Sequence, residues 1–462
     1  MIYYSNSIEG DEMANTIDMT KDKYWKVILR FALPIFLSNL FQQLYNAADS
    51  LIVGNFLDTY ALAAVSSSGS LIFFFTSFFT GTAMGAGVVI SKYFGKKDYV
   101  NMRKAIHTDI AFGLIASVIL TGLGYFISPQ ILVWMDTDPD VLPLSVSYFQ
   151  TYFLGVSAVI MYNIFTGICN AIGNSKQPLY YLIFSSIMNI ILDLLFVGLF
   201  KWGVWSAAVA TVISQFASAL LCFKFLLKKG PVYQVSIKEI SIDKSMLKEI
   251  INYGIPTGVQ NSVISIANIV VQSHVNAFGE YAMAASGTFH KLEGFGFLPI
   301  TAFTMAITTF VSQNFGAGEN ERAKQGARFG IITSVIAAEV IGLIMFLASP
   351  VLVSLFDSTA EVVALGTRQM RTECLFFFLL AYSHCIAAVC RGSGRASVPM
   401  LIMLIIWCGI RVLYLTIMRN FSTDIVYVYW AYPITWFLSS VVYLIYYLKS
   451  GWEKGFKPLK SN

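Results

Sequence analysis

Two carboxylates lie inside long apolar stretches of this chain, where a helix in a membrane would keep them away from water. Asp49 stands in the stretch 41–54, and Asp193 stands in the stretch 189–200. An ionisable side chain at membrane depth costs about 2.5–3.5 kcal/mol on insertion scales, so its presence indicates a function. Oxygen-bearing side chains of this kind bind protons or hard cations such as sodium.

The chain around these acids has the composition of a helical membrane protein. Of its 462 residues, 56% are hydrophobic and only 12% are charged, whereas soluble domains carry about 25% charged residues. Apolar runs long enough to cross a bilayer recur along the chain, and backbone polar groups within such runs must be satisfied by helical hydrogen bonds. The predicted fold class is therefore an all-α polytopic membrane protein, with twelve transmembrane helices between residues 27 and 448.

The distribution of lysine and arginine predicts an orientation in the membrane. With the N-terminus inside, 25 of the 31 Lys and Arg residues fall on the cytoplasmic side, and four lie outside: Lys201, Arg368, Arg371 and Arg419. The positive-inside rule then predicts that both termini are cytoplasmic. The net charge of +5 is attributed to these basic loops, so we expect no nucleic-acid partner.

The two halves of the chain are copies of each other. When the sequence is aligned with itself at a shift of 221 residues, Ser91 aligns with Ser312. The turn CNAIGNSKQP, which begins at Cys169, aligns with CRGSGRASVP, which begins at Cys390. Each copy holds six helices, an even number, so the copies have the same topology and form a parallel repeat about an axis along the membrane normal. The predicted domains are an N-lobe at 27–227, a cytoplasmic linker at 228–246 and a C-lobe at 247–448.

The acids of the N-lobe are not part of the repeated pattern, because Asp49 aligns with Val271. At 1.5 Å per helical residue, Asp49, Asp193 and Thr211 all lie about 12–14 Å from the external surface and can share one layer. Asn189 is one turn from Asp193 on the same helix face.

Two acids, an amide and a hydroxyl at one depth suit a proton or a bare sodium ion, because hard cations take oxygen ligands and neighbouring carboxylates favour retention of a proton. The alternative interpretation is that Asp49 and Asp193 only cap, or hydrogen-bond to, neighbouring helices.

The C-lobe carries a mixed set of intramembrane charges. Lys291, Glu293 and Arg411 lie within its apolar spans. With Gln42 of the first span, they are the candidates for a substrate site or a C-lobe charge site. The alternative for the three charged residues is a structural group of ions. Lys291 and Glu293 are two residues apart and do not share a helix face.

Several longer segments together resemble the multidrug and toxic compound extrusion (MATE) family, over about residues 27–448. The resemblance rests on the first span with Pro34, Gln42 and Asp49, on YALAAVS at Tyr60, on QNFGAGENERA at Gln313, on the paired turns above and on NIILDLLFVGLFKWGVWSAAVAT at 189–211.

The resemblance implies two six-helix bundles that form a V around a central cavity. Members of the family exchange protons or sodium ions for organic, often cationic, drugs. It further implies that Asp49, Asn189, Asp193 and Thr211 match the family's N-lobe cation site. The stretch 262–276 lacks the seventh-helix acid of one branch, which places the chain closer to the DinF-like branch.

The resulting hypothesis is a secondary antiporter that exports amphipathic, often cationic compounds by alternating access, and not an enzyme. We expect no cofactor, and a proton or sodium as the coupling ion, because no GxxxxGK[ST] motif for ATP is present. Expected partners are small organic cations or amphipathic drugs and membrane lipids, and we expect a monomer in the plasma (inner) membrane.

Three other function classes fit the sequence less well. A flippase for a lipid-linked saccharide would use Lys291 and Arg411 to meet a diphosphate head group. An intramembrane enzyme would need clustered acids holding magnesium near the cytoplasmic face, whereas the acidic cluster of this chain lies in an external loop. A passive scaffold or receptor does not explain why acids persist at matched depth in one lobe.

Overall fold

The computed structural model describes residues 16–57, 59–134 and 137–456, and these residues form helices and connecting turns without a strand. They divide into two compact units. Of the described residues, unit 1 contains 16–18 and 37–254, and unit 2 contains 19–36 and 255–456. The predicted all-α fold is confirmed, while the arrangement of the two lobes as a V around a cavity stays a prediction.

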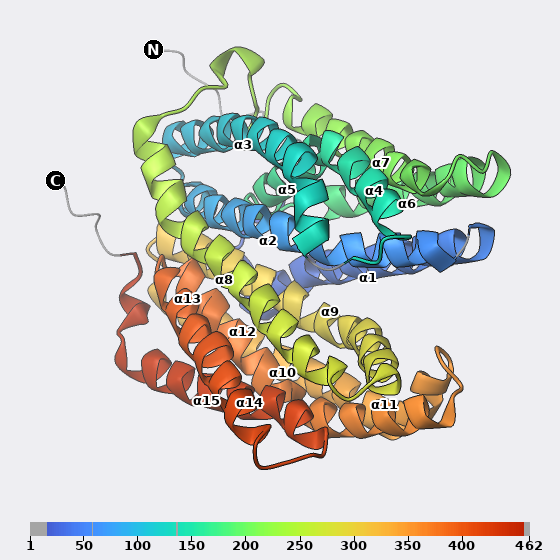
Figure 1. Cartoon of the computed structure of the whole chain (residues 1–462). Helices are drawn as coiled ribbons and strands as arrows, with labels where there is room; N and C mark the ends of the chain where they lie inside the picture. The colour runs from blue at the N-terminus through green and yellow to red at the C-terminus, as the bar shows by residue number, and fades with distance from the viewer. Residues whose placement is uncertain (1–15, 58, 135–136, 457–462) are drawn as a thin grey trace, which may run out of the picture. The chain divides into compact units, whose positions relative to one another are not determined.

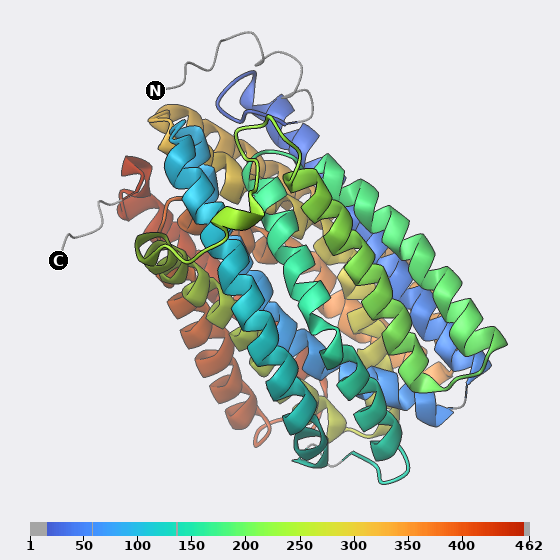
Figure 2. The same ribbon diagram turned by 90° about the horizontal axis from the view of Figure 1, so that it is seen from above.

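Unit 1 is built from the second half of α1 (Tyr24–Phe56), from the first part of α8 (Lys244–Asn276), and from the helices between them (Figures 1 and 2). These are α2 (Thr59–Gly95), α3 (Tyr99–Trp134), α4 (Leu142–Leu154), α5 (Val156–Ala171), α6 (Lys176–Asp193), the π-helix η1 (Leu194–Leu199), α7 (Val204–Leu226) and the 3₁₀ turn η2 (Ile237–Glu239).

Unit 2 contains the first part of α1 and the rest of α8. Its other elements are α9 (Glu280–Gly316), α10 (Asn320–Ser354), α11 (Ala360–Glu373), η3 (Cys374–Phe376), α12 (Phe377–Gly392), α13 (Ser397–Met403), the π-helix η4 (Leu404–Ile410), α14 (Arg411–Met418), α15 (Val426–Lys449) and η5 (Trp452–Lys454). The predicted boundaries, with an N-lobe that ends at 227, a linker at 228–246 and a C-lobe that begins at 247, stay a prediction.

Every predicted span corresponds to a helix or to consecutive helices. In the described part of the chain, nine helical segments are long and apolar enough to cross a membrane. A tenth span is formed if α4 and α5, which meet at 48°, are one broken span. The other two predicted spans correspond to α2 and α8, which are 37 and 33 residues long and are not among those ten.

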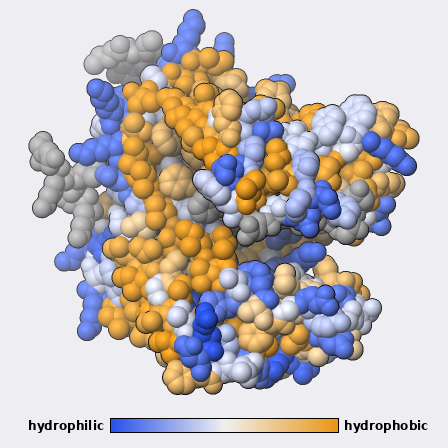
Figure 3. Space-filling model, viewed as in Figure 1, coloured by the Kyte–Doolittle hydropathy of each residue, from blue (hydrophilic) through white to orange (hydrophobic). Residues whose placement is uncertain are grey.

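The outward faces of several helices are apolar, as expected for contact with lipid. On α10, Ile332, Ile336, Val340, Leu343 and Leu347 are exposed at helical spacing. Figure 3 shows broad apolar patches on the face that it presents. A continuous exposed stripe of this kind is a liability in water but is the favoured surface in a bilayer.

The internal repeat extends to individual hydrogen bonds within each unit. In unit 1, Ser91 Oγ donates to the carbonyl of Ala171 at 3.0 Å, and in unit 2 Ser312 Oγ donates to the carbonyl of Gly392 at 3.0 Å. The turns that follow each contain a glycine with positive φ, Gly173 and Gly394, a conformation that other residues adopt only with strain. The internal repeat is therefore confirmed at the level of local geometry.

The QNFGAGENERA motif anchors the segment that precedes α1. Within unit 2, the carbonyl of Met19 accepts hydrogen bonds from Arg322 Nε at 3.2 Å and from Asn314 Nδ2 at 3.1 Å, and its N–H donates to Gln313 Oε1 at 3.2 Å. Met19 is fully buried. The polar residues of this motif thus have a structural role in satisfying backbone groups.

Candidate cation site

Three helices of unit 1 bring the predicted cation-binding residues together. α1 supplies Asp49, α6 supplies Asn189 and Asp193, and the neighbouring α7 supplies Thr211. Asp193 is the last residue of the α-helical part of α6, and the π-helix η1 follows directly. Such a π segment inside a helix is frequent at functional sites because it changes the direction of side chains.

The two carboxyl groups interact directly with each other. Asp49 and Asp193 lie close enough to influence each other electrostatically, although their residue numbers differ by 144. Asp193 is completely buried and Asp49 is half-buried. Two such groups repel each other when both are ionised, so a positive charge placed between them is stabilised.

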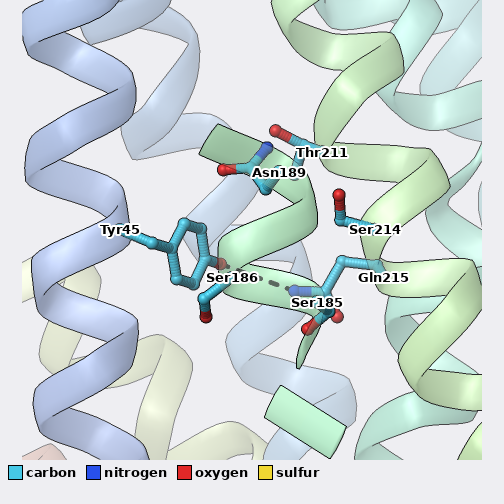
Figure 4. Close-up of a pocket in the computed structure, with 7 residues that line it drawn as sticks. All are labelled: Tyr45, Ser185, Ser186, Asn189, Thr211, Ser214 and Gln215. Atoms are coloured by element: carbon cyan, nitrogen blue, oxygen red, sulfur yellow. Dashed lines mark hydrogen bonds between the residues drawn. The ribbon is translucent and has the colours of Figure 1, made fainter. Parts of the chain in front are cut away.

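A narrow pocket lies beside these acids (Figure 4). Its space admits a water-sized species. Tyr45 reaches into it from α1, and the rest of its lining comes from α6 and α7: Ser185, Ser186, Asn189, Thr211, Ser214 and Gln215.

The hydroxyl groups of α7 present their oxygen lone pairs to this pocket. Thr211 Oγ1 donates its proton to the carbonyl of Ala207 at 3.1 Å, and Ser214 Oγ donates to the carbonyl of Ala210 at 2.8 Å. With the proton committed to the backbone, each oxygen is left as an acceptor. An acceptor that faces a pocket favours a cation there.

Buried acceptors around the acids outnumber buried donors. Both carboxylate oxygens of Asp193, Oδ1 of Asp49 and both amide atoms of Asn189 lack a hydrogen-bond partner among the described residues. Unpaired buried polar groups are costly and call for a functional explanation. Carboxylate, amide and hydroxyl oxygens fit a proton or a sodium ion, which would be transported ions rather than resident cofactors.

The second set of predicted residues is only partly brought together. Arg411 and Glu293 belong to one charged cluster in unit 2, together with Glu373. Lys291 lies apart from it, exposed, with its Nζ 6.0 Å from the ring of Phe356. Lys291 and Glu293 are two residues apart and project from different sides of α9, as expected from the sequence. A common substrate site of Lys291, Glu293 and Arg411 stays a prediction.

Gln42 also lies outside the C-lobe set. It is exposed on the part of α1 that belongs to unit 1, where it interacts with the hydroxyl of Tyr45. Its neighbourhood is therefore that of the cation site, one turn of helix from the pocket.

Three polar residues near these sites were not predicted from the sequence. Gln215 Nε2 donates to Tyr45 Oη at 3.4 Å across the pocket. Glu373 is fully buried. An acid within the tenth predicted span was a signal that could have identified it.

Glu339, for which the sequence offered no role, accepts a hydrogen bond on Oε2 from the N–H of Phe378 at 3.0 Å. Phe378 is in the first turn of α12, whose N–H groups lack partners within the helix. Glu339 therefore caps α12 from the neighbouring helix α10.

A model of the MatE family matches this chain twice, over residues 34–195 and 256–417. The two matches begin 222 residues apart, which agrees to within one residue with the shift of 221 found within the sequence.

Named relatives cover nearly the whole chain. The probable multidrug resistance protein YoeA of Bacillus subtilis is 28% identical over 443 residues, with 94% of this chain and 96% of YoeA covered. The multidrug export protein MepA of Staphylococcus aureus is 26% identical over 389 residues, with 83% of this chain and 85% of MepA covered.

Solved structures share the fold. A MOP superfamily transporter from Pyrococcus furiosus matches with a TM-score of 0.90 at 20% identity, over 96% of this chain and 99% of that chain. An outward-facing multidrug resistance MATE family transporter gives the same values. The DinF-like assignment within the family stays a prediction. Since the family model covers more than half of the sequence, once in each repeat, the chain belongs to the MatE family.

Proposed function

We propose that this chain is a secondary active antiporter that exports amphipathic, often cationic organic compounds in exchange for protons or sodium ions. The observation that carries the proposal is the acidic pair of the half-buried Asp49 and the buried Asp193, beside a polar pocket in a protein of the MatE family. The names of YoeA and MepA as multidrug resistance and export proteins support the substrate class.

Ion binding at this pair would couple to transport through the helices that carry it. Asp49 is on α1 and Asp193 is on α6, so a cation that neutralises their repulsion favours the arrangement in which the two helices are close. Loss of the cation favours their separation. A ligand shifts such an equilibrium only by its differential affinity for the two states, so a substrate that prefers the separated arrangement is exchanged for the ion.

The multi-pass membrane location follows from the family and the apolar helices. The plasma (inner) membrane, two cytoplasmic termini and a monomeric state complete the proposal. A lipid-linked saccharide flippase is not favoured, because Arg411 is fully buried among acids and rings rather than open to a diphosphate.

The decisive experiment is dye transport in everted membrane vesicles with proton and sodium gradients imposed separately. Vesicles with the wild-type protein should accumulate a cationic dye when one of the two gradients is imposed. Asp49→Asn and Asp193→Asn should each lower the ion-driven rate at least tenfold, because an amide beside the one remaining carboxylate is not repelled by it when the ion leaves. All variants should insert to the same level in immunoblots.

Asp140→Asn is the matched control, since it makes the same change at an exposed external acid. It should transport at the wild-type rate. Wild-type transport by both Asp49→Asn and Asp193→Asn would contradict the assignment of the cation site, and transport of labelled lipid-linked saccharide without dye transport would favour the flippase.

A further inference from the structure

The linker between the two repeats is fastened to α3 by a buried histidine. His107 lies near the start of α3 and is buried, and its Nε2 accepts a hydrogen bond from the backbone N–H of Ser236 at 3.0 Å. Its Nδ1 lies 2.7 Å from the carbonyl oxygen of Arg103. All three residues belong to unit 1. We call these two hydrogen bonds the His107 clasp.

The partners of the ring fix its protonation state. A carbonyl oxygen only accepts hydrogen bonds, so Nδ1 carries the proton of the ring, and a backbone N–H only donates, so Nε2 carries none. An imidazolium has a proton on both nitrogens and cannot accept the bond from Ser236. The clasp therefore exists only while His107 is neutral. Histidine is the side chain that ordinarily changes its charge between about pH 5 and 8.

A second partner for the ring lies beside Ser236. Glu239 Oε2 is 3.9 Å from His107 Nε2 and 3.5 Å from Arg103 Nη2. The side chain of Glu239 is 58% exposed, whereas that of His107 is 5% exposed, so Glu239 connects the buried ring to solvent. A carboxylate that accepts from an imidazolium forms a charge-assisted hydrogen bond, which is stronger than a bond between neutral groups.

Both ends of the segment that carries these partners are anchored independently of His107. At one end, the N–H of Val235 donates to the carbonyl of Leu226 at 2.8 Å. At the other end, the N–H of Asp243 donates to Thr108 Oγ1 at 3.1 Å, and Asp243 Oδ1 accepts from backbone N–H groups in the first turn of α8. Residues 236–242 can thus exchange one partner on α3 for another while the ends of the segment stay in place.

Other ionisable groups near the clasp do not compete for the ring. In the described chain, Glu239 is the one carboxylate that pairs with His107. The others near the start of α3 are Lys104, which pairs with Asp243, the buried Asp109, Lys92 and Tyr93 on α2, which both bond to Glu249, the buried Cys169 on α5, and the exposed Lys238 on the linker.

We propose that the His107 clasp is a pH-sensitive switch on the linker. When Nε2 takes up a proton from water, one N–H bond forms, the hydrogen bond from Ser236 is lost and the new N–H donates to the carboxylate of Glu239. The linker then has a second arrangement on α3 at acidic pH, on the side that the positive-inside rule places in the cytoplasm. The inference does not rest on the proposed antiport, because none of these residues belongs to the candidate cation site.

A spin label on the linker of the purified full-length protein tests the switch. Ile237 is 64% exposed, and none of the six native cysteines is exposed, so a nitroxide on Ile237→Cys reports on this segment. Its spectrum should change in a single one-proton transition between about pH 5 and 8. Adding His107→Gln should abolish the transition. His274→Gln is the matched control, since His274 Nδ1 also lies against the carbonyl four residues earlier, that of Val270, at 2.9 Å, but on α8 outside the clasp.

Nitrogen NMR of protein labelled with ¹⁵N-histidine keeps the test independent of folding of the variants. The signals assigned to His107 by their loss in His107→Gln should show a proton on Nδ1 alone above the transition and on both nitrogens below it. Glu239→Gln should move the transition to lower pH, because the imidazolium loses its carboxylate partner. A neutral ring with its proton on Nε2, no transition in the wild type, or a transition that survives in His107→Gln would overturn the proposal.

Discussion

Arg411 shows how this protein keeps a guanidinium in its interior. Its planar group lies against Trp407 and Tyr432 and shares one threonine oxygen between two of its nitrogens. Cation–π contacts of a desolvated guanidinium contribute about 2 kcal/mol each or more. Thr435 can accept from Arg411 because its own proton is directed to the carbonyl of Ala431 at 2.8 Å.

We predict that Thr435→Val lowers the free energy of unfolding by about 1–3 kcal/mol. Valine has the shape of threonine but leaves two donors of Arg411 unpaired, and hydrogen bonds to charged groups are of this strength. Thermal unfolding in detergent, followed by tryptophan fluorescence, measures the change. Thr435→Ser keeps the acceptor and should be about as stable as the wild type. An equal loss of stability in both variants would show that Thr435 contributes through its packing and not through its hydrogen bonds to Arg411.

At the scale of elements, the π-helices coincide with intramembrane charges. η1 begins directly after Asp193, and η4 ends directly before Arg411. A wider helical turn alters which side chains face the interior. The periodicity of the sequence predicts regular helices in both places, since a π segment leaves the apolar pattern almost unchanged.

Within unit 1, α2 and the first part of α8 approach closely through two glycines. A Cβ atom on Gly85 would lie 2.3 Å from Cα of Gly254. Next to this crossing, Glu249 of α8 accepts from Lys92 Nζ at 2.6 Å and from Tyr93 Oη at 2.9 Å. The GxxxG pattern formed by Gly81 and Gly85 predicts close packing, and this is confirmed for Gly85.

Gly85→Ala should therefore destabilise the protein by about 1–3 kcal/mol, because backbone atoms must move to admit the methyl group. Gly87→Ala on the same helix is the control, since its Cβ would lie 3.7 Å from the nearest atom, an ordinary contact. The melting temperature in detergent should fall for Gly85→Ala only. A fall of the same size in Gly87→Ala would point to a general effect of alanine in α2.

At the scale of the whole molecule, the predicted topology can be tested with single cysteines. None of the six cysteines is exposed, and five are buried, so the background reactivity is low. Asn420→Cys and Lys176→Cys place thiols at exposed sites that the positive-inside rule puts on opposite sides of the membrane.

In intact cells, a membrane-impermeant maleimide should label Asn420→Cys fully and leave Lys176→Cys unlabelled. Permeabilised cells should label both. Labelling of Lys176→Cys in intact cells would reverse the topology, and with it the proposal that both termini are cytoplasmic.

The features that the sequence determined are those that depend on local pattern. Apolar runs show where helices lie, the shift of 221 residues shows that the fold is repeated, and Asp49, Asn189 and Asp193 stand out because charge and amides are costly in such runs. The two copies of the MatE match agree with this repeat.

The tertiary structure alone decided which charges meet. Glu373, Glu293 and Arg411 come from three helices whose rotation about their axes is set by packing, not by the pattern along any one of them. Lys291, two residues from Glu293 in sequence, lies near the ring of Phe356. A pattern of residue types predicts how deep a charge lies, whereas its partner depends on side-chain packing between helices that are distant in sequence.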